Sequence, residues 1–152
     1  MKVVSIPKKV NASVVRLVGG QVFLLSLLYI VTAHPLIPVF LIADFAVRAL
    51  GYPRFSLLAR TGVILSQVLK LKYRPIFFTP KRFAALIGLF LSSGALVLAL
   101  SGLNLTAVLV ISVLGLFSFL ESGFGFCAGC KIFAFLMHRG WIPSKFCEDC
   151  AA

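Results

Sequence analysis

The chain has 152 residues, of which 61% are hydrophobic and only 12% are charged. An ordinary soluble domain is roughly 45–50% apolar and about 25% charged, so this composition excludes a water-soluble globular protein and indicates a single membrane domain over residues 1–152. The formal net charge is +11. Such a charge can indicate a nucleic-acid partner, so the positions of the basic residues relative to the apolar segments have to be considered.

The N-terminal half contains two apolar segments separated by a turn. We expect a membrane span over residues 14–33, a turn at His34-Pro35 and a shorter span over residues 35–50, which carries Asp44 and Arg48. A cleavable signal peptide is the rival interpretation of the first segment. The immediate second apolar segment and the absence of a small-residue cleavage site argue against it.

The stretch between residues 51 and 81 predicts a helix that lies in the membrane interface. Over residues 56–72, apolar residues share one side at helical spacing, whereas Arg60, Gln67 and Lys70 share another. Such a helix places its apolar face in lipid and its basic face toward the headgroups.

The longest uncharged run extends from Phe83 to Leu120, where 38 residues include no Asp, Glu, Lys, Arg or His. One straight helix of that length would measure about 57 Å, against a hydrocarbon core of about 30 Å. The run must therefore fold back, and the turn residues Ser101–Asn104 mark the place. We expect spans over residues 83–100 and 105–121.

The fold class predicted is thus all-α: four transmembrane helices as two hairpins, an interfacial amphipathic helix, and a short cytoplasmic helix near the C-terminus. All 15 of the 15 Lys and Arg residues fall on one side of these spans. The positive-inside rule places that side, and both termini, in the cytoplasm. We therefore expect a multi-pass protein of the cytoplasmic (inner) membrane. Anionic lipid then accounts for the charge, and no nucleic acid is expected as a partner.

The four cysteines form two C-x-x-C pairs in the C-terminal helix and tail, residues 127–152. These pairs are Cys127-Ala-Gly-Cys130 and Cys147-Glu-Asp-Cys150. Structural disulfides are not expected, because cytoplasmic thiols are kept reduced. The spacing is typical of a tetrahedral zinc site with four thiolate ligands, and an iron–sulfur cluster is a less favoured candidate for the same ligands.

A redox dithiol is the second interpretation of the cysteines, and spacing alone does not decide between the two. Cys127 and Cys130 stand where a helix over residues 128–139 begins, and a helix N-terminus stabilises a thiolate. Lys131 adds positive charge, whereas Glu148 and Asp149 favour a relay role for the second pair.

Four charged residues are expected at membrane depth. Asp44 and Arg48 are four residues apart and share a helix face, while Glu121 lies at a similar depth to Arg82. Charges at that depth normally face a partner or a polar cavity. The two pairs either hold the bundle together or form a proton or anion path to the thiols, with Glu121 as a candidate proton acceptor. No hydrolase triad and no glycine-rich phosphate loop is visible in the sequence.

Three motifs resemble those of a known family: Gly51-Tyr-Pro-Arg-Phe-Ser56, Pro80-Lys-Arg-Phe-Ala84 followed by Gly88, and the block from Glu121 to Lys131 around the first cysteine pair. The chain from about Val10 to Cys150 resembles the small bacterial and archaeal membrane proteins called domain of unknown function 4395. That resemblance implies a four-helix membrane domain without a defined biochemistry. It also implies thioredoxin-like or sulfurtransferase proteins as partners.

Three functions are therefore expected from the sequence. The first is thiol redox or sulfur transfer, with Cys127 and Cys130 as the working pair and Cys147 and Cys150 as a relay pair. The second is a non-enzymatic scaffold with a four-cysteine zinc site, and the third is a small transporter for a sulfur-containing or other anion. Transport through such short spans would require an oligomer.

Overall fold

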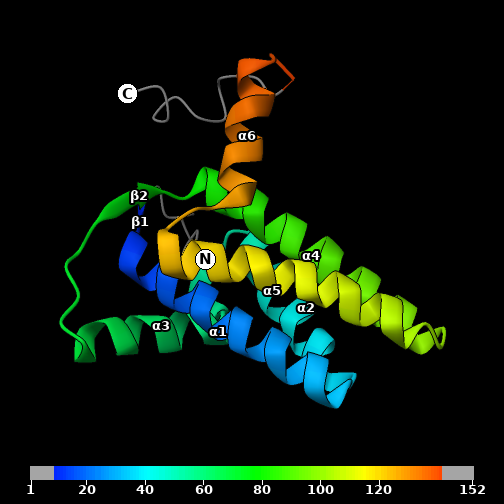
Figure 1. Cartoon of the computed structure of the whole chain (residues 1–152). Coiled ribbons are helices and arrows are strands. Elements are labelled where there is room, and N and C mark those ends of the chain that lie inside the picture. The colour runs from blue at the N-terminus through cyan, green and yellow to red at the C-terminus, as the bar shows by residue number, and fades with distance from the viewer. Residues whose placement is uncertain (1–8, 142–152) are drawn as a thin grey trace, which may run out of the picture.

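A computed structural model describes residues 9–141, which form an all-helical bundle with one small two-stranded ribbon (Figure 1). The predicted helical fold class is confirmed. The elements in chain order are β1 Lys9–Asn11, α1 Ala12–Thr32, α2 Leu36–Ala49, the 3-10 helix η1 Pro53–Phe55, α3 Leu57–Val68, β2 Pro75–Phe77, α4 Thr79–Leu100, α5 Asn104–Phe124 and α6 Ala128–His138.

Helices α1, α4 and α5 are long and apolar enough to cross a membrane, with 21, 22 and 21 residues. At a rise of about 1.5 Å per residue they measure roughly 31–33 Å, which matches a hydrocarbon core of about 30 Å. Their outward faces are apolar as well: Val31, Phe90 and Leu105 are each at least 76% exposed. Such faces are compatible with lipid and not with water.

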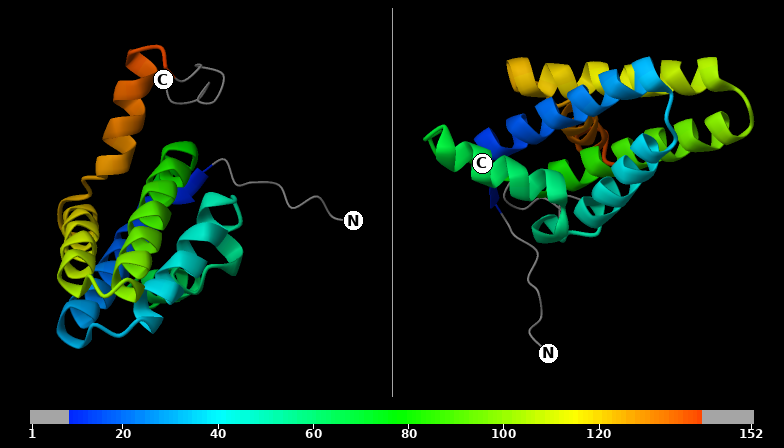
Figure 2. Two further views of the ribbon diagram at one scale, coloured as in Figure 1. Left: turned by 90° about the vertical axis from the view of Figure 1, so that its right-hand side faces the viewer. Right: turned by 90° about the horizontal axis from the view of Figure 1, so that it is seen from below.

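Helix α2 is shorter, with 14 residues, and measures about 21 Å. The structure therefore supports three spans by length, and α2 is the weak member of the four that the sequence predicts. The helix nevertheless returns along the bundle. Its contacts are mainly with α4, and both hairpin turns lie at the same end of the molecule (Figure 2).

Small residues allow the helices of the bundle to approach closely, as is common between membrane helices. A β-carbon at Gly115 in α5 would stand 3.0 Å from Ser26 Cβ in α1. Between α2 and α4, the Phe45 ring lies over Gly88, where a β-carbon would come within 2.7 Å of it. At these positions the small residue lets a side chain of the neighbouring helix, such as Phe45, pack directly against the helix backbone.

Helix α3 packs across the first half of α1. Gly62 lies against Val18, and the Thr61 hydroxyl donates a hydrogen bond of 2.6 Å to Gln21 Oε1. The opposite face of α3 is apolar and exposed; Val68, for example, is 71% exposed. The predicted amphipathic helix is therefore present, and its apolar surface continues the apolar surface of the bundle.

The ribbon joins the segments that precede α1 and α4. Strands β1 and β2 are antiparallel, with Lys9 opposite Phe77 and Asn11 opposite Pro75. Asn11 also caps α1, since its side chain accepts a hydrogen bond of 3.0 Å from the backbone N–H of Ser13. Because the two strands pair, α1 and α4 start at the same end of the bundle.

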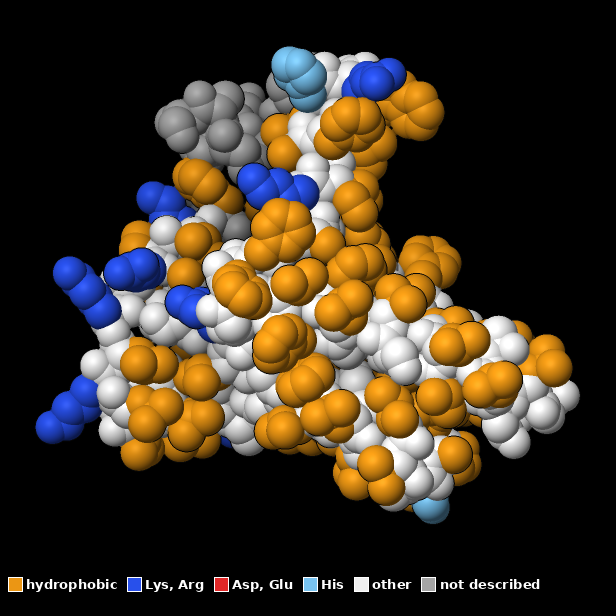
Figure 3. Space-filling model, viewed as in Figure 1, with side chains coloured by type: hydrophobic (Ala, Val, Ile, Leu, Met, Phe, Trp, Pro, Cys, Tyr) orange, Lys and Arg blue, Asp and Glu red, His pale blue; other side chains and the backbone are white. Residues whose placement is uncertain are grey.

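Basic side chains gather at this end. In the face shown in Figure 3, the Lys and Arg side chains lie over α6, the ribbon and the free end of α3, while the hairpin turns carry none. This agrees with the sequence, in which neither His34-Pro35 nor Ser101–Asn104 includes a Lys or an Arg.

Candidate functional site

Cys127 lies at the N-cap of α6, in the short connection that follows α5. Helix α5 ends at Gly125, which has a positive φ of 69°, a conformation that suits glycine. Cys127 itself is extended, with φ −97° and ψ 106°, and its Sγ accepts the backbone N–H of Cys130 at 3.4 Å. The sulfur thus occupies the position where a side chain satisfies an otherwise unpaired helix N–H.

The start of α6 is held against α4 by a very close contact. A β-carbon at Gly129 would stand 2.6 Å from the β-carbon of Ala84, so only glycine fits without a shift. One turn further along α6, the rings of Phe133 and Phe83 have centroids 5.6 Å apart. These contacts fix the cysteine pair next to the first turns of α4.

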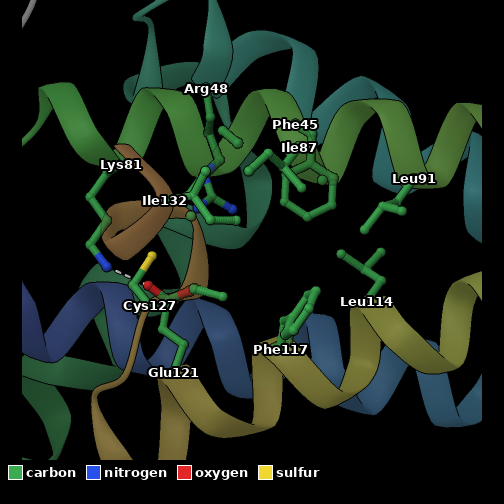
Figure 4. Close-up of a pocket in the computed structure, with 16 residues that line it drawn as sticks. Phe45, Arg48, Lys81, Ile87, Leu91, Leu114, Phe117, Glu121, Cys127 and Ile132 are labelled. Carbon is green, nitrogen blue, oxygen red and sulfur yellow. Dashed lines mark hydrogen bonds and ion pairs between the residues drawn. The ribbon is translucent and has the colours of Figure 1, made fainter. Parts of the chain in front are cut away.

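Lys81 and Glu121 form an ion pair beside the Cys127 sulfur (Figure 4). The prediction that Glu121 would pair with Arg82 is wrong: Arg82 Nε donates instead to the backbone carbonyl of Ala49 at 3.1 Å. Consecutive helical residues point about 100° apart, so Lys81 and Arg82 face different neighbours. Lys81 faces α5, and Arg82 faces the end of α2.

Lys81 is also the cation that acts on the thiols. The sequence suggested Lys131 for this role, but Lys131 is exposed on α6. Lys81 lies near enough to both cysteines to favour their ionised forms. Glu121 has the opposite effect on Cys127, and its ion pair holds the Lys81 ammonium in place.

The two thiols differ in acidity and in access. A hydrogen bond from Cys130 lowers the pKa of Cys127 from 9.0 to about 7, assisted by Lys81 and the Cys130 N–H and opposed by burial and Glu121. The same hydrogen bond and burial raise the pKa of Cys130. Cys127 is only 8% exposed, whereas Cys130 is partly exposed. The more acidic sulfur is therefore the less accessible one.

A small cavity opens beside Cys127 between α2, α4, α5 and α6. Its volume is about 70 Å³, and its polar lining comes from Arg48, Lys81, Ser118, Glu121 and Cys127. A water molecule requires about 10–15 Å³ measured in this way. The cavity consequently has room for a few waters or a group of a few atoms next to the sulfur.

The predicted pair of Asp44 and Arg48 is confirmed, with 3.5 Å between Oδ2 and Nη1. Asp44 has a further role that the sequence did not indicate. Its Oδ1 accepts hydrogen bonds from the Ser56 hydroxyl at 2.6 Å and from the Leu58 N–H at 3.2 Å. Asp44 therefore ties the first turn of α3 to α2, which is a structural role at 5% exposure.

The second cysteine pair, Cys147 and Cys150, lies outside the described residues. Between residues 9 and 141, no group of three or more His, Cys, Asp or Glu side chains is placed to hold a metal ion. A zinc site would take Cys127 and Cys130 as two of its four ligands, so the four-cysteine site stays a prediction, as does the anion-transport role.

Three helices that are long and apolar enough to cross a membrane, with a Cys-x-x-Cys motif at one end of the bundle, indicate the class of helical membrane proteins. The family model for the domain of unknown function 4395 (DUF4395) matches residues 10–138, and the chain belongs to this family. The predicted membership is confirmed, and the matched range includes Cys127 and Cys130. Comparison with curated proteins and with solved structures finds no match.

Proposed function

We propose that the protein is a membrane-held thiol–disulfide exchange protein whose working pair is Cys127 and Cys130. The observation that carries the proposal is the asymmetry of the pair. Cys127 is buried and acidic at a helix N-cap beside Lys81, while Cys130 is more exposed and less acidic. A low-pKa thiolate is a good leaving group in disulfide exchange.

The asymmetry favours one direction of exchange. With the pair oxidised, a thiolate of a partner dithiol attacks the accessible Cys130 sulfur, the Cys127–Cys130 bond breaks, and Cys127 leaves as a thiolate. The second partner thiol, once it loses its proton, attacks the partner's own sulfur in the mixed disulfide and releases Cys130, which takes up a proton. Two electrons pass to this pair and the partner ends as a disulfide. Stabilising the reduced form in this way makes a pair more oxidising.

Thioredoxin-like proteins are the partner class that this exchange would suit. Cys147 and Cys150 are the proposed relay pair: in their oxidised form they accept the two electrons from the reduced Cys127 and Cys130. Sulfur transfer is a second candidate, because the cavity beside Cys127 admits a group of a few atoms, such as a terminal persulfide sulfur. Lys81 would offset the charge of such a group. Glu121 then acts as a positioning residue for Lys81.

The proposed topology has four passes, with both termini and the cysteines in the cytoplasm. Pairing of β1 with β2 supports it, because the starts of α1 and α4 share one end and the chain between them must return. Helix α2 makes that return with 14 residues. Such a short span requires a locally thinner bilayer or flanking basic side chains that reach the interface.

The full-length protein, purified without oxygen, tests the proposal. Two matched variants, Cys127→Ser/Cys130→Ser and Cys147→Ser/Cys150→Ser, separate the pairs. In glutathione redox buffers we expect the Cys147→Ser/Cys150→Ser variant to form and lose one intramolecular disulfide reversibly, and the other variant to lack that disulfide. Zinc at one ion per chain, with all thiols of the wild type protected from maleimide until chelation, would establish the scaffold instead.

A direct test of the direction adds reduced glutathione to the oxidised Cys147→Ser/Cys150→Ser variant and traps the mixed disulfide with acid. Because Cys130 is the more accessible sulfur and Cys127 the better leaving group, we expect peptide mass spectrometry to find glutathione on Cys130 and a free thiol at Cys127. Glutathione on Cys127 would show that Cys127 is the attacked sulfur, and the assigned direction would be wrong.

A further inference from the structure

A large groove lies at the basic end of the bundle, between the start of α1, the 3-10 helix η1 and α3. Its volume is about 540 Å³, within the range of roughly 300–1,000 Å³ that small-molecule sites occupy. It adjoins the cysteine site, because Arg48 and Lys81 line both. The groove has an apolar part and a basic part, and together these indicate the kind of ligand that it binds.

One part of the groove is apolar. Val14 and Val18 of α1 face Val63 and Ile64 of α3 across it. The exposed face of α3 continues this apolar lining outward, since Ile64 is 60% exposed. A hydrocarbon chain that entered from the bilayer would therefore remain against apolar side chains throughout.

The other part is strongly basic. Arg48, Arg54, Arg60 and Lys81 line the groove, and neither of the two carboxylates in residues 9–141 does. Arg48 and Lys81 are already paired with Asp44 and Glu121. Within the described part of the chain, the guanidinium groups of Arg54 and Arg60 make no ion pair and no hydrogen bond. Two unneutralised cations thus stand beside an apolar slot.

We propose that this groove binds one anionic phospholipid from the leaflet on the basic side of the protein. Arg54 and Arg60 hold the headgroup phosphate, which guanidinium groups bind with two parallel hydrogen bonds, and the valine-lined part holds an acyl chain. A soluble phosphate would match only the cations, and a zwitterionic lipid would bring a compensating positive charge to them. An anionic lipid matches both parts.

Native mass spectrometry of the full-length protein, released from detergent in the presence of phosphatidylglycerol or phosphatidylcholine, tests the proposal. We expect one phosphatidylglycerol molecule to be retained in preference to phosphatidylcholine. A basic residue near an anionic surface contributes about 1 kcal/mol, so the Arg54→Gln/Arg60→Gln variant should weaken retention roughly 30-fold.

The matched control is Lys72→Gln/Arg74→Gln, which removes two cations from the same connecting segment. Both side chains are exposed, and neither lines the groove. Retention should stay at the wild-type value. An equal loss in the two double variants would show that the lipid responds to diffuse charge, and the site would be rejected.

Two further measurements separate a lipid from a soluble anion. Val63→Trp fills the apolar part and leaves the cations in place, so it should abolish retention of phosphatidylglycerol; helical circular dichroism checks its fold, and the milder Ile64→Ser should reduce retention. Inorganic phosphate should not displace the lipid. Retention that persists in both apolar variants, or displacement by phosphate, would show a headgroup-only anion site and overturn the lipid assignment.

Discussion

Gly129 in α6 touches Ala84 in α4 so closely that a β-carbon added at position 129 would stand 2.6 Å from the Ala84 β-carbon and 2.7 Å from its Cα. The glycine between the two cysteines is therefore the residue that docks the motif onto the bundle. The separation between the thiols and the Lys81–Glu121 pair depends on this contact together with the packing of Phe133 against Phe83.

Gly129→Ala should push the start of α6 away from α4. Overpacking of this kind costs about 1–3 kcal/mol, so we expect a lower Tm and faster reaction of Cys127 with iodoacetamide, with the modified residue assigned by mass spectrometry. Gly94→Ala is the control, since no atom lies within 4 Å of a β-carbon there. Equal rates and equal Tm values in the two variants would show that the contact does not set thiol access.

The alkylation rate of Cys127 should rise with pH around a midpoint of about 7, the lowered pKa of this thiol. Lys81 favours the thiolate, so Lys81→Met should move the midpoint to higher pH. Glu121 disfavours the thiolate, so Glu121→Gln should move it to lower pH. Lys131→Gln removes an exposed cation and should leave the midpoint in place. Shifts in the same direction for Lys81→Met and Glu121→Gln would contradict this charge arrangement.

Asp44→Ala should destabilise the protein by about 3 kcal/mol, because it leaves the half-buried Arg48 without its partner and removes two hydrogen bonds from the start of α3. Asp44→Asn retains the acceptor oxygen for Ser56 and Leu58 and should cost less. Thermal unfolding in detergent, followed by circular dichroism, measures both. If the two variants lost the same stability, the cap on α3 would contribute nothing.

The four-pass topology predicts opposite labelling at two single cysteines placed in a background without native cysteines. Ser101→Cys, in the turn between α4 and α5, should react with a membrane-impermeant maleimide in intact cells. Lys72→Cys, beside the ribbon, should react only after the cells are opened. Labelling of Lys72→Cys in intact cells would show that the basic end faces outward and that the proposed orientation is inverted.

Charge-free runs and turn residues were sufficient to predict the helices. The expected spans over 83–100 and 105–121 correspond to α4 Thr79–Leu100 and α5 Asn104–Phe124. The predicted start of α4 is four residues late because the span is defined by the charge-free run, which begins at Phe83. The helix itself also includes Pro80 and the basic pair after it, and proline is well tolerated in a first helical turn. The ribbon was missed because three-residue strands have no periodicity to detect.

The candidate site was predicted in part. Position in the sequence was enough to place Cys127 and Cys130 at the start of a helix, which the structure confirms. It could not identify Lys81 over Arg82 as the partner of Glu121, because that choice depends on the rotation of α4 against α5. The hydrogen bond that the Ser56 hydroxyl donates to Asp44 could not be predicted either, because it depends on how the start of α3 lies against α2.

The ribbon also has a consequence for synthesis. Strand β2 leaves the ribosome about 65 residues after β1, which at 5–20 residues per second is a delay of roughly 3–13 s. During that interval β1 has no partner strand, and in the proposed four-pass topology the first hairpin precedes β2 into the bilayer. If the proposed topology holds, the ribbon can close only when the starts of α1 and α4 lie on the same side of the membrane, so its closure would follow insertion of both hairpins.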